Sequence, residues 1–445
     1  MRFQSRTRWL PAAFVAAAAL AASGTPTGAQ THQVPAESLI YDLKNPDPDR
    51  RQIAARQLGI AKHAPATPDL VALASDPIPS VRREAELSLE QMDDIRALPG
   101  FVQFTSDSEK DIRDRAVQAL VNLHLPRSTG PASTLVKIGN FINAKDEDED
   151  TVVEPDIPVD SVVVDALRAR INDPEVQVRR DASRGLGILR AGAAIPDLVA
   201  AVREDRDNDV RVEAVRALRK IGEPSIGESI TPLLNLNTDR VRNEIVSTVG
   251  YLRYRRAVSD LTKVFEQSRP LERSRRLALS ALADIADPSS APLFESYKAD
   301  KNIMIRLYAN EGLARIADPA TKTALSGARL TEKNLRVQTA QAFGLLKMGQ
   351  LEYMDELIRR LGNPTTRELA KEYLAETRSA DRGLLFEKRS DKANVRADLA
   401  EVFGRIGDKT ALPALQDLAN DSDTDVSRAA ERALRRINAS GHGDD

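Results

Sequence analysis

Apolar residues recur along this chain in blocks of about 31 residues, and each block is built around one arginine. Successive arginines lie 29 to 33 residues apart, except for one step of 66 residues that amounts to two periods with a small insertion. A repeat of this length indicates a solenoid, in which each unit packs only against its neighbours. The repeated residues are Arg51, Arg82, Arg113, Arg179, Arg211, Arg242, Arg275, Arg306, Arg336, Arg367 and Arg396, with Ser427 in the twelfth place.

The apolar positions around each arginine fit one face of a helix. The residue before the arginine is Val, Ile or Leu in nine copies, and alanine follows three residues later in nine of the twelve. Offsets of −1, +3 and +7 lie on one side of a helix with 3.6 residues per turn, so each block predicts one amphipathic helix. The apolar residues at +7 are Leu58, Leu89, Leu120, Leu186, Leu218, Val249, Leu282, Leu313, Phe343, Leu374, Phe403 and Leu434.

A second, shorter helix is predicted between successive arginine helices. It often opens on a proline, which is tolerated in a first helical turn because its missing N–H would be unpaired there. Asp76-Pro77 and Asp173-Pro174 are typical of the turns, and we expect the aspartate to cap the next helix and the proline to take its first position. Small residues at +8 let neighbouring helices approach closely, and these are Gly59, Gly187, Gly250, Gly344 and Gly404.

The period and the motif VRxxAxxAL resemble the short HEAT-like repeats named after phycobiliprotein lyases, within the armadillo-like superfamily. The resemblance covers residues 37–438. It implies an all-α fold, a right-handed α-solenoid superhelix of about twelve HEAT-like helix pairs with the arginine helices on the concave side. It also implies that the arginines form a structural ladder with acidic residues six positions before an arginine. These are Asp76, Asp107, Asp173, Asp205, Asp300 and Asp421.

The repeats fall into two blocks, residues 37–125 and 161–438, separated by an insertion at 126–160. Within the insertion, Lys145–Asp156 carries a run of carboxylates, which predicts an exposed acidic loop. The run lacks the spaced ligands and the turn-forming glycine of a calcium loop, so we favour a solvated loop and leave Ca²⁺ binding open. Residues 439–445 predict a disordered tail.

The first 29 residues have the pattern of an export signal. Three arginines precede the apolar run Trp9–Ala22, and small residues lead up to Ala29. We therefore predict a signal peptide at 1–29, cut between Ala29 and Gln30, and a periplasmic or secreted protein. The alternative is an uncleaved anchor. No later stretch approaches the ~20 apolar residues of a membrane-spanning helix, so we expect none in the mature chain.

Charge and cysteine usage narrow the class of partner. The chain carries 64 Lys and Arg against 66 Asp and Glu, and removal of the signal segment leaves 61 against 66. This balance supplies no general attraction to nucleic acid, and we predict no nucleic-acid partner. There is no cysteine, so the stability of the exported chain must come from buried apolar surface.

Residues for catalysis or metal binding are sparse. Packed helix layers 8–10 Å apart would place His63 and His124 about 20 Å from each other, too far to share a metal ion. HEAT-like enzymes that hydroxylate a lysine-derived residue hold two irons with His-Glu pairs, and neither histidine is followed by glutamate. Gly185-Leu186-Gly187 begins like a dinucleotide fingerprint, but Arg190 replaces its third glycine. We predict no catalytic residue, metal or cofactor.

A basic segment is the candidate binding surface. Residues 168–276 carry 22 Lys and Arg against 16 Asp and Glu, a balance that suits an anionic partner. The alternative is ordinary solvated charge, balanced by nearby carboxylates. Arg184, Arg216, Lys220 and Arg253 avoid the apolar offsets, so we expect their side chains to reach solvent. The full set of candidate partner-binding residues is Arg180, Arg184, Arg216, Lys220, Tyr251, Arg253, Tyr254 and Arg255.

The prediction from sequence is an exported, non-catalytic scaffold that binds a protein or peptide along its concave face. The alternative is an enzyme related to HEAT-like lyases or hydroxylases that acts on a protein substrate. The sequence leaves the identity of the partner and the oligomeric state open.

Overall fold

A computed structural model describes residues 34–125, 152–153, 157–235, 238–270 and 272–439. The predicted signal segment, most of the predicted insertion and nearly all of the predicted tail lie outside these residues. Among the described residues no helix is long and apolar enough to cross a membrane.

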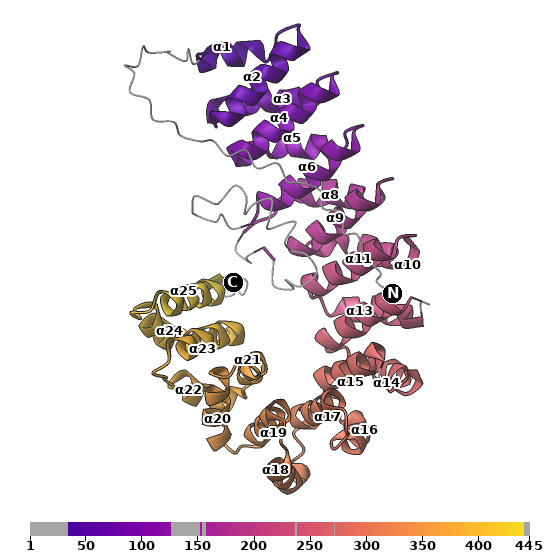
Figure 1. Cartoon of the computed structure of the whole chain (residues 1–445), viewed down its shortest axis with the longest axis vertical. Coiled ribbons are helices and arrows are strands. Elements are labelled where there is room, and N and C mark those ends of the chain that lie inside the picture. The colour runs from indigo at the N-terminus through magenta and orange to yellow at the C-terminus, as the bar shows by residue number, and fades with distance from the viewer. Residues whose placement is uncertain (1–33, 126–151, 154–156, 236–237, 271, 440–445) are drawn as a thin grey trace, which may run out of the picture.

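Within the described residues, twelve helix pairs follow one another, which confirms the predicted all-α solenoid (Figure 1). The first helices of the pairs are α1 (Ala36–Asp42), α3 (Thr67–Ala72), α5 (Leu98–Phe104), α8 (Ser161–Arg170), α10 (Ile195–Glu204), α12 (Ser225–Ile230), α14 (Val258–Gln267), α16 (Ala291–Tyr297), α18 (Lys322–Thr331), α20 (Glu352–Leu361), α22 (Arg382–Phe386) and α24 (Leu412–Ala419). The second helices are α2 (Pro48–Ile60), α4 (Pro79–Met92), α6 (Lys110–Asn122), α9 (Val176–Ile188), α11 (Asn208–Ile221), α13 (Asp239–Tyr251), α15 (Arg273–Ile285), α17 (Ile303–Ile316), α19 (Leu335–Lys347), α21 (Arg367–Ala375), α23 (Ala393–Ile406) and α25 (Thr424–Ala439).

The second helices carry the repeated arginines and pack side by side as an inner layer. A β-carbon added at Gly187 in α9 would lie 2.5 Å from Ala217 Cα in α11, and one at Gly250 would lie 2.6 Å from Ala281 Cα. No side chain fits at such separations, so glycine is required where these helix backbones touch. The close approach predicted for the +8 positions is confirmed.

The predicted arginine ladder is present between several neighbouring repeats. Arg113 Nε and Nη2 donate to the two carboxylate oxygens of Asp173 at 2.8 and 2.9 Å, and Arg113 Nη1 donates to the Asp107 carbonyl of its own repeat. The insertion lies between Arg113 and Asp173 in sequence, so the ladder continues across it. The same two-pronged pairing joins Arg51 to Asp76, Arg82 to Asp107, Arg179 to Asp205, and Arg396 to Asp421.

Two details of the predicted turns and ladder are wrong. Asp76 Oδ1 accepts from Ile78 N, and α4 begins only at Pro79, so the Asp-Pro pair forms a turn ahead of the helix instead of its cap and first residue. The Asp300 carboxylate takes no part in the ladder. It accepts from Asn302 N, whereas Arg275 of the preceding repeat donates to the hydroxyl of Tyr297.

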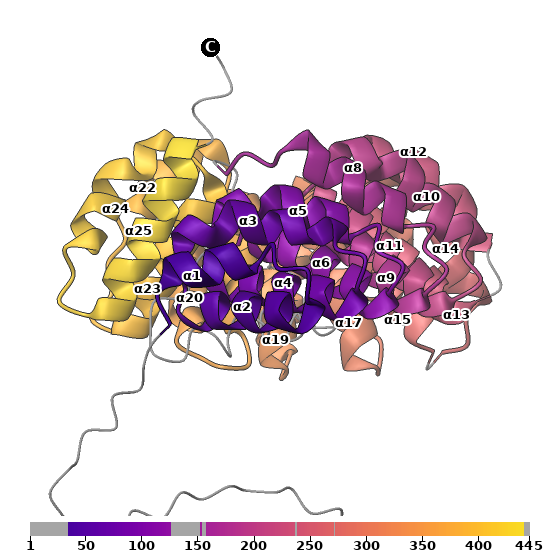
Figure 2. The same ribbon diagram turned by 90° about the horizontal axis from the view of Figure 1, so that it is seen from above.

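The solenoid curls into a hook with the inner helices on its concave side (Figure 1). The repeats from α1 to α13 form one arm, the chain turns through α15 to α19, and α21 to α25 return towards the first arm. Seen from above, the C-terminal helices lie opposite α8 to α14 (Figure 2). The apolar core is buried between the two layers in two sections, which meet at α17.

Candidate functional site

A cavity of 1290 Å³ lies on the concave side of the hook. The inner helices from α9 to α25 all contribute to its lining, mostly through residues two, five and nine positions after the repeated arginine. These offsets fall on the helix face opposite the buried one. The hook therefore encloses one groove, which we call the concave groove.

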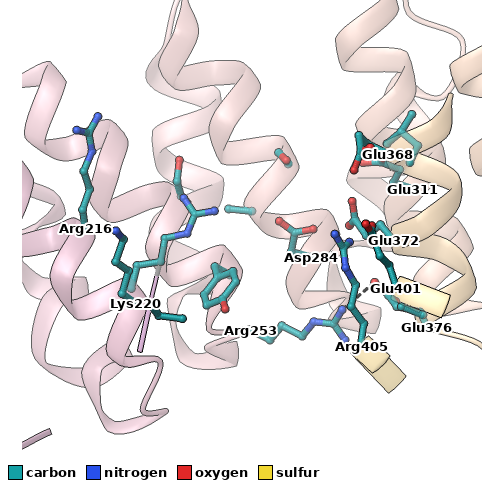
Figure 3. A pocket seen from close by; sticks show the side chains of 18 of the residues that line it. Arg216, Lys220, Arg253, Asp284, Glu311, Glu368, Glu372, Glu376, Glu401 and Arg405 are labelled. Atoms are coloured by element: carbon teal, nitrogen blue, oxygen red, sulfur yellow. Dashed lines mark hydrogen bonds and ion pairs between the residues drawn. The ribbon is translucent and has the colours of Figure 1, made fainter. Parts of the chain in front are cut away.

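The structure brings five of the eight predicted binding residues into this groove. Arg184, Arg216, Lys220, Tyr251 and Arg253 line it, and Figure 3 shows Arg216 and Lys220 on one side with Glu368, Glu372 and Glu376 on the other. The other three lie outside the lining, and these are Arg180, Tyr254 and Arg255.

The expectation that Arg184 reaches solvent is wrong. Its side chain is 8% exposed, and Nε donates to Glu213 Oε2 at 3.2 Å. The glycine contact between α9 and α11 brings Glu213 close enough to cover it. Arg216 is also partly covered, because it pairs with Glu213 at 3.0 Å and with Glu244 at 3.4 Å. The Arg253 side chain is more than half exposed, and it pairs with Glu376.

The aromatic candidates differ in their surroundings. The Tyr251 ring lies exposed at the end of α13, with the Arg219 guanidinium 5.0 Å from its centroid. The Tyr254 ring fills the space beside Gly227 of α12, where an added β-carbon would lie 2.5 Å from it. Tyr254 is therefore a packing residue of the outer layer, away from the groove.

An acidic cluster on the groove floor escaped the sequence analysis. It surrounds Arg315 of α17, whose side chain is only 3% exposed. Arg315 lies 3.2 Å from Asp284 of α15 and 3.0 Å from Glu376 at the end of α21, and it donates to Glu372 as well. Burial of one arginine among several carboxylates supplies the pairing that a desolvated guanidinium requires.

Two carboxyl groups of this cluster titrate far from their ordinary range. Burial raises the pKa of Glu311 to about 7, against the opposing effects of Arg315 and of the hydrogen bond from Tyr373 Oη. Burial also raises the pKa of Asp284 to about 6, again against Arg315. A third of the Asp284 side chain is exposed in the groove, so water reaches this carboxyl and weakens the effect of burial. The floor is therefore less negative near neutral pH than its carboxylates suggest.

Arg253 links two distant parts of the groove. Its Nη2 donates to Glu376 Oε1 at 2.8 Å, which joins the end of α13 to the end of α21 across 123 residues. Arg315 and Lys347 also lie at or near the C-terminal ends of their inner helices. The C-terminal end of a helix carries partial negative charge, so these three cations are stabilised near the C-terminal ends of the inner helices.

Val152 and Val153 belong to the segment that the sequence predicted as an exposed loop, and the structure places them against α9 and the groove. The Val153 amide donates to the Ile188 carbonyl at 2.8 Å, and the valine is 4% exposed. Ile188 is the last residue of α9, so this bond satisfies one of the carbonyls that a helix end leaves free. Val152 lines the groove beside it. The prediction of an exposed segment is wrong at Val153, which is buried, whereas Val152 is half-buried.

In the part of the chain that the structure describes, the histidine contact of note is a local one made by His124. The Nδ1 atom of His124 lies 2.8 Å from the Leu120 carbonyl, one turn earlier in the same helical segment. Within the described residues, no group of three or more His, Cys, Asp or Glu side chains is arranged to hold a metal ion.

Comparisons with known proteins match the repeats. The HEAT repeat family matches residues 36–121, 164–250 and 383–443, which together exceed half of the chain. The bilin biosynthesis protein PecE of Nostoc sp. is 39% identical over 69 residues, which are 16% of this chain and 26% of that protein. The chain thus spans about a quarter of the length of this curated relative.

Solved structures give weaker likenesses. An engineered protein matches 91% of this chain and 98% of its own at 19% identity and a TM-score of 0.39. The complex of CpcE and CpcF of phycocyanin lyase from Nostoc sp. PCC7120 matches 62% of this chain and 94% of its own at 18% identity and a TM-score of 0.33.

Proposed function

The chain belongs to the HEAT repeat family, and we propose that it is an exported, non-catalytic scaffold that binds a segment of a partner protein in the concave groove. The observation that carries this proposal is the 1290 Å³ cavity, lined by side chains from α9 to α25. Concave surfaces of stacked repeats are extended and polar, which suits a polypeptide better than a small apolar ligand.

The way the groove uses its charged groups supports binding over catalysis. Arg315, Arg253 and Glu376 connect α13, α15, α17 and α21 to one another. Lys371 likewise joins Glu368 of α21 to Glu401 of α23. These ion pairs join inner helices to one another, which favours a preformed surface for a partner.

Export is supported by the residue pattern of the first 29 positions. Trp9 is the only tryptophan, so the cleaved protein contains none. We expect protein recovered outside the cytoplasm to begin at or near Gln30 and to show tyrosine-only fluorescence. Tryptophan emission from that material would mean that the segment is retained as an anchor.

Site-specific photo-cross-linking tests the binding site. A photoreactive amino acid replaces Glu368, an exposed glutamate of the groove, and in a matched variant it replaces Glu266, an exposed glutamate of the outer helix α14. Irradiation of the exported protein in its own envelope should attach a partner protein at position 368 and leave position 266 unmodified. Equal capture at both positions would rule out the groove as the binding site.

A second candidate is a lyase-type enzyme, favoured by the 39% identity with the bilin biosynthesis protein PecE over 69 residues. It is tested by incubating the purified chain with a linear tetrapyrrole. A visible absorption band that comigrates with the protein would favour the enzyme, and an unchanged spectrum would favour the scaffold.

A further inference from the structure

We propose that the groove takes an acidic segment of its partner protein, held between two basic walls that face each other across the cavity. This inference rests on the proposed scaffold function and specifies the partner's chemistry. The first wall is the end of α11, with Arg216 and Lys220. The second wall is formed by α23 and α25, with Arg405 and Arg432.

The curl of the solenoid creates the pair of walls. Arg216 and Arg432 are separated by seven repeats in sequence, yet both line the same cavity. Figure 1 shows the helices that carry them on opposite arms of the hook, and Figure 3 places Arg405 across the cavity from Arg216 and Lys220. A segment lying in the groove is therefore within reach of both walls.

The lining has a net positive charge, although the chain as a whole is slightly negative. Eleven Lys and Arg residues line the groove against eight Asp and Glu, whereas the formal net charge of the chain is −2. The pKa of Glu311 near 7 removes part of the remaining negative charge. A groove with net positive charge attracts an anionic segment, even though the protein as a whole is slightly acidic.

The acidic groups of the lining already have cationic partners within the protein. Asp284, Glu372 and Glu376 contact Arg315, while Glu368 and Glu401 contact Lys371. In contrast, Arg405 and Arg432 are exposed, and neither forms an ion pair with a carboxylate among the described residues. The second wall therefore has charge to offer a ligand without breaking an internal pair.

The acidic floor selects a polypeptide over a nucleic acid. A nucleic acid carries phosphates along its whole length, and some of them would be forced against Glu372 and Glu376. A peptide distributes its charge residue by residue, so its carboxylates can face the walls while neutral or basic side chains face the floor. We therefore expect an acidic stretch that also contains neutral or basic residues.

Fluorescence anisotropy on the full mature chain tests this inference. The probes are a labelled peptide of alternating glutamate and alanine, a peptide of alternating lysine and alanine, and single-stranded oligothymidine. The glutamate peptide should bind most tightly, and its affinity should fall as salt rises because added ions screen the walls. Tightest binding of oligothymidine or of the lysine peptide would overturn the proposal.

Charge reversal locates the binding. The double variant Arg405→Glu and Arg432→Glu should weaken the glutamate peptide by on the order of tenfold or more. The matched control, Arg203→Glu with Lys263→Glu on the outer helices α10 and α14, makes the same change of net charge on exposed residues. Equal weakening in both double variants, or in neither, would overturn the proposal. Thermal melts of both variants check that they remain folded.

The two proposals fail in different ways. Capture of a protein at position 368 together with no preference for the glutamate peptide would reject the acidic partner and keep the scaffold. Absence of capture at position 368 would reject the scaffold itself.

Discussion

The N-terminal repeats and the central repeats carry the same arginine at the same place and use it differently. Between α2 and α9, each ladder arginine donates hydrogen bonds to both carboxylate oxygens of an aspartate in the next repeat. In the centre, Arg211 donates to the Val202 carbonyl, and Arg275 lies 4.0 Å over the Phe265 ring. Position 236, where the aspartate for Arg211 would stand, holds leucine. A missing partner explains Arg211 but not Arg275, because Asp300 stands in the ladder position and Arg275 donates to the Tyr297 hydroxyl instead.

The same two regions differ in where neighbouring repeats are tied together. The ladder joins the N-terminal ends of the inner helices at a regular spacing. In the central repeats a further set of charged contacts lies at the opposite, C-terminal ends, where Arg315 joins α15, α17 and α21. Contacts between helices two repeats apart require tight curvature, so the turn of the hook is located there.

Removing one repeated arginine from the N-terminal repeats and one from the central repeats should have the largest effect on the free energy of unfolding. Arg113→Ala leaves the fully buried Asp173 carboxylate without its main partner, so we expect a loss of roughly 3–5 kcal/mol. Arg211→Ala leaves one carbonyl without its donor and should cost about 1–3 kcal/mol. Chemical denaturation, with hydrogen exchange of α6, α9 and α11, measures both. An equal loss in the two variants would contradict the difference in roles.

Removing Arg315 should change shape as well as stability. Arg315→Ala leaves Asp284, Glu372 and Glu376 facing one another, with an expected loss of up to about 3–5 kcal/mol. Their repulsion should open the hook and raise the radius of gyration in small-angle scattering. The control is Arg329→Ala, which breaks a partly buried pair with Glu356 between the outer helices. If both variants keep the radius of the unaltered protein, Arg315 does not set the curvature.

The smallest expected effect is on the pH dependence of the free energy of unfolding. The N-terminal repeats and the central repeats each contribute one buried glutamate to it. Burial raises the pKa of Glu86 in α4 to about 9, with Glu90 adding to the shift, and the pKa of Glu311 in α17 is about 7. The folded protein then holds these protons more tightly than the unfolded chain does. The free energy of unfolding should therefore fall as pH rises from about 4 through each folded value.

Matched neutral variants separate the two contributions. Both carboxylate oxygens of Glu86 are buried without a hydrogen-bond partner among the described residues. Above pH 9, Glu86→Gln should exceed the unaltered protein in stability by roughly 1–3 kcal/mol, and near pH 4 the two should agree. Glu311→Gln should flatten only the part of the profile below about pH 8. Denaturation across this pH range decides, and a profile unchanged by either variant would refute the assignment.

The sequence by itself determined the repeat number, the pairing of helices, the glycine contacts and the regular part of the ladder. Each of these depends on residues within one repeat or its neighbour, so a period of about 31 residues reports them directly. The basic side of the groove could also be predicted from the sequence, because Arg216 and Lys220 stand at polar offsets of a recognisable helix. The burial of Arg184 could not be predicted, because it depends on how closely Glu213 of the next repeat approaches.

Only the tertiary structure decided which inner helices meet across the hook. A small rotation at every repeat accumulates along a solenoid, and no local residue pattern records the sum. Arg315 and Glu376 are 61 residues apart, Arg253 and Glu376 are 123 apart, and each looks in sequence like an ordinary exposed charge. Their pairing, and with it the acidic floor between two basic walls, exists because the accumulated curvature carries the C-terminal repeats back to the middle of the chain.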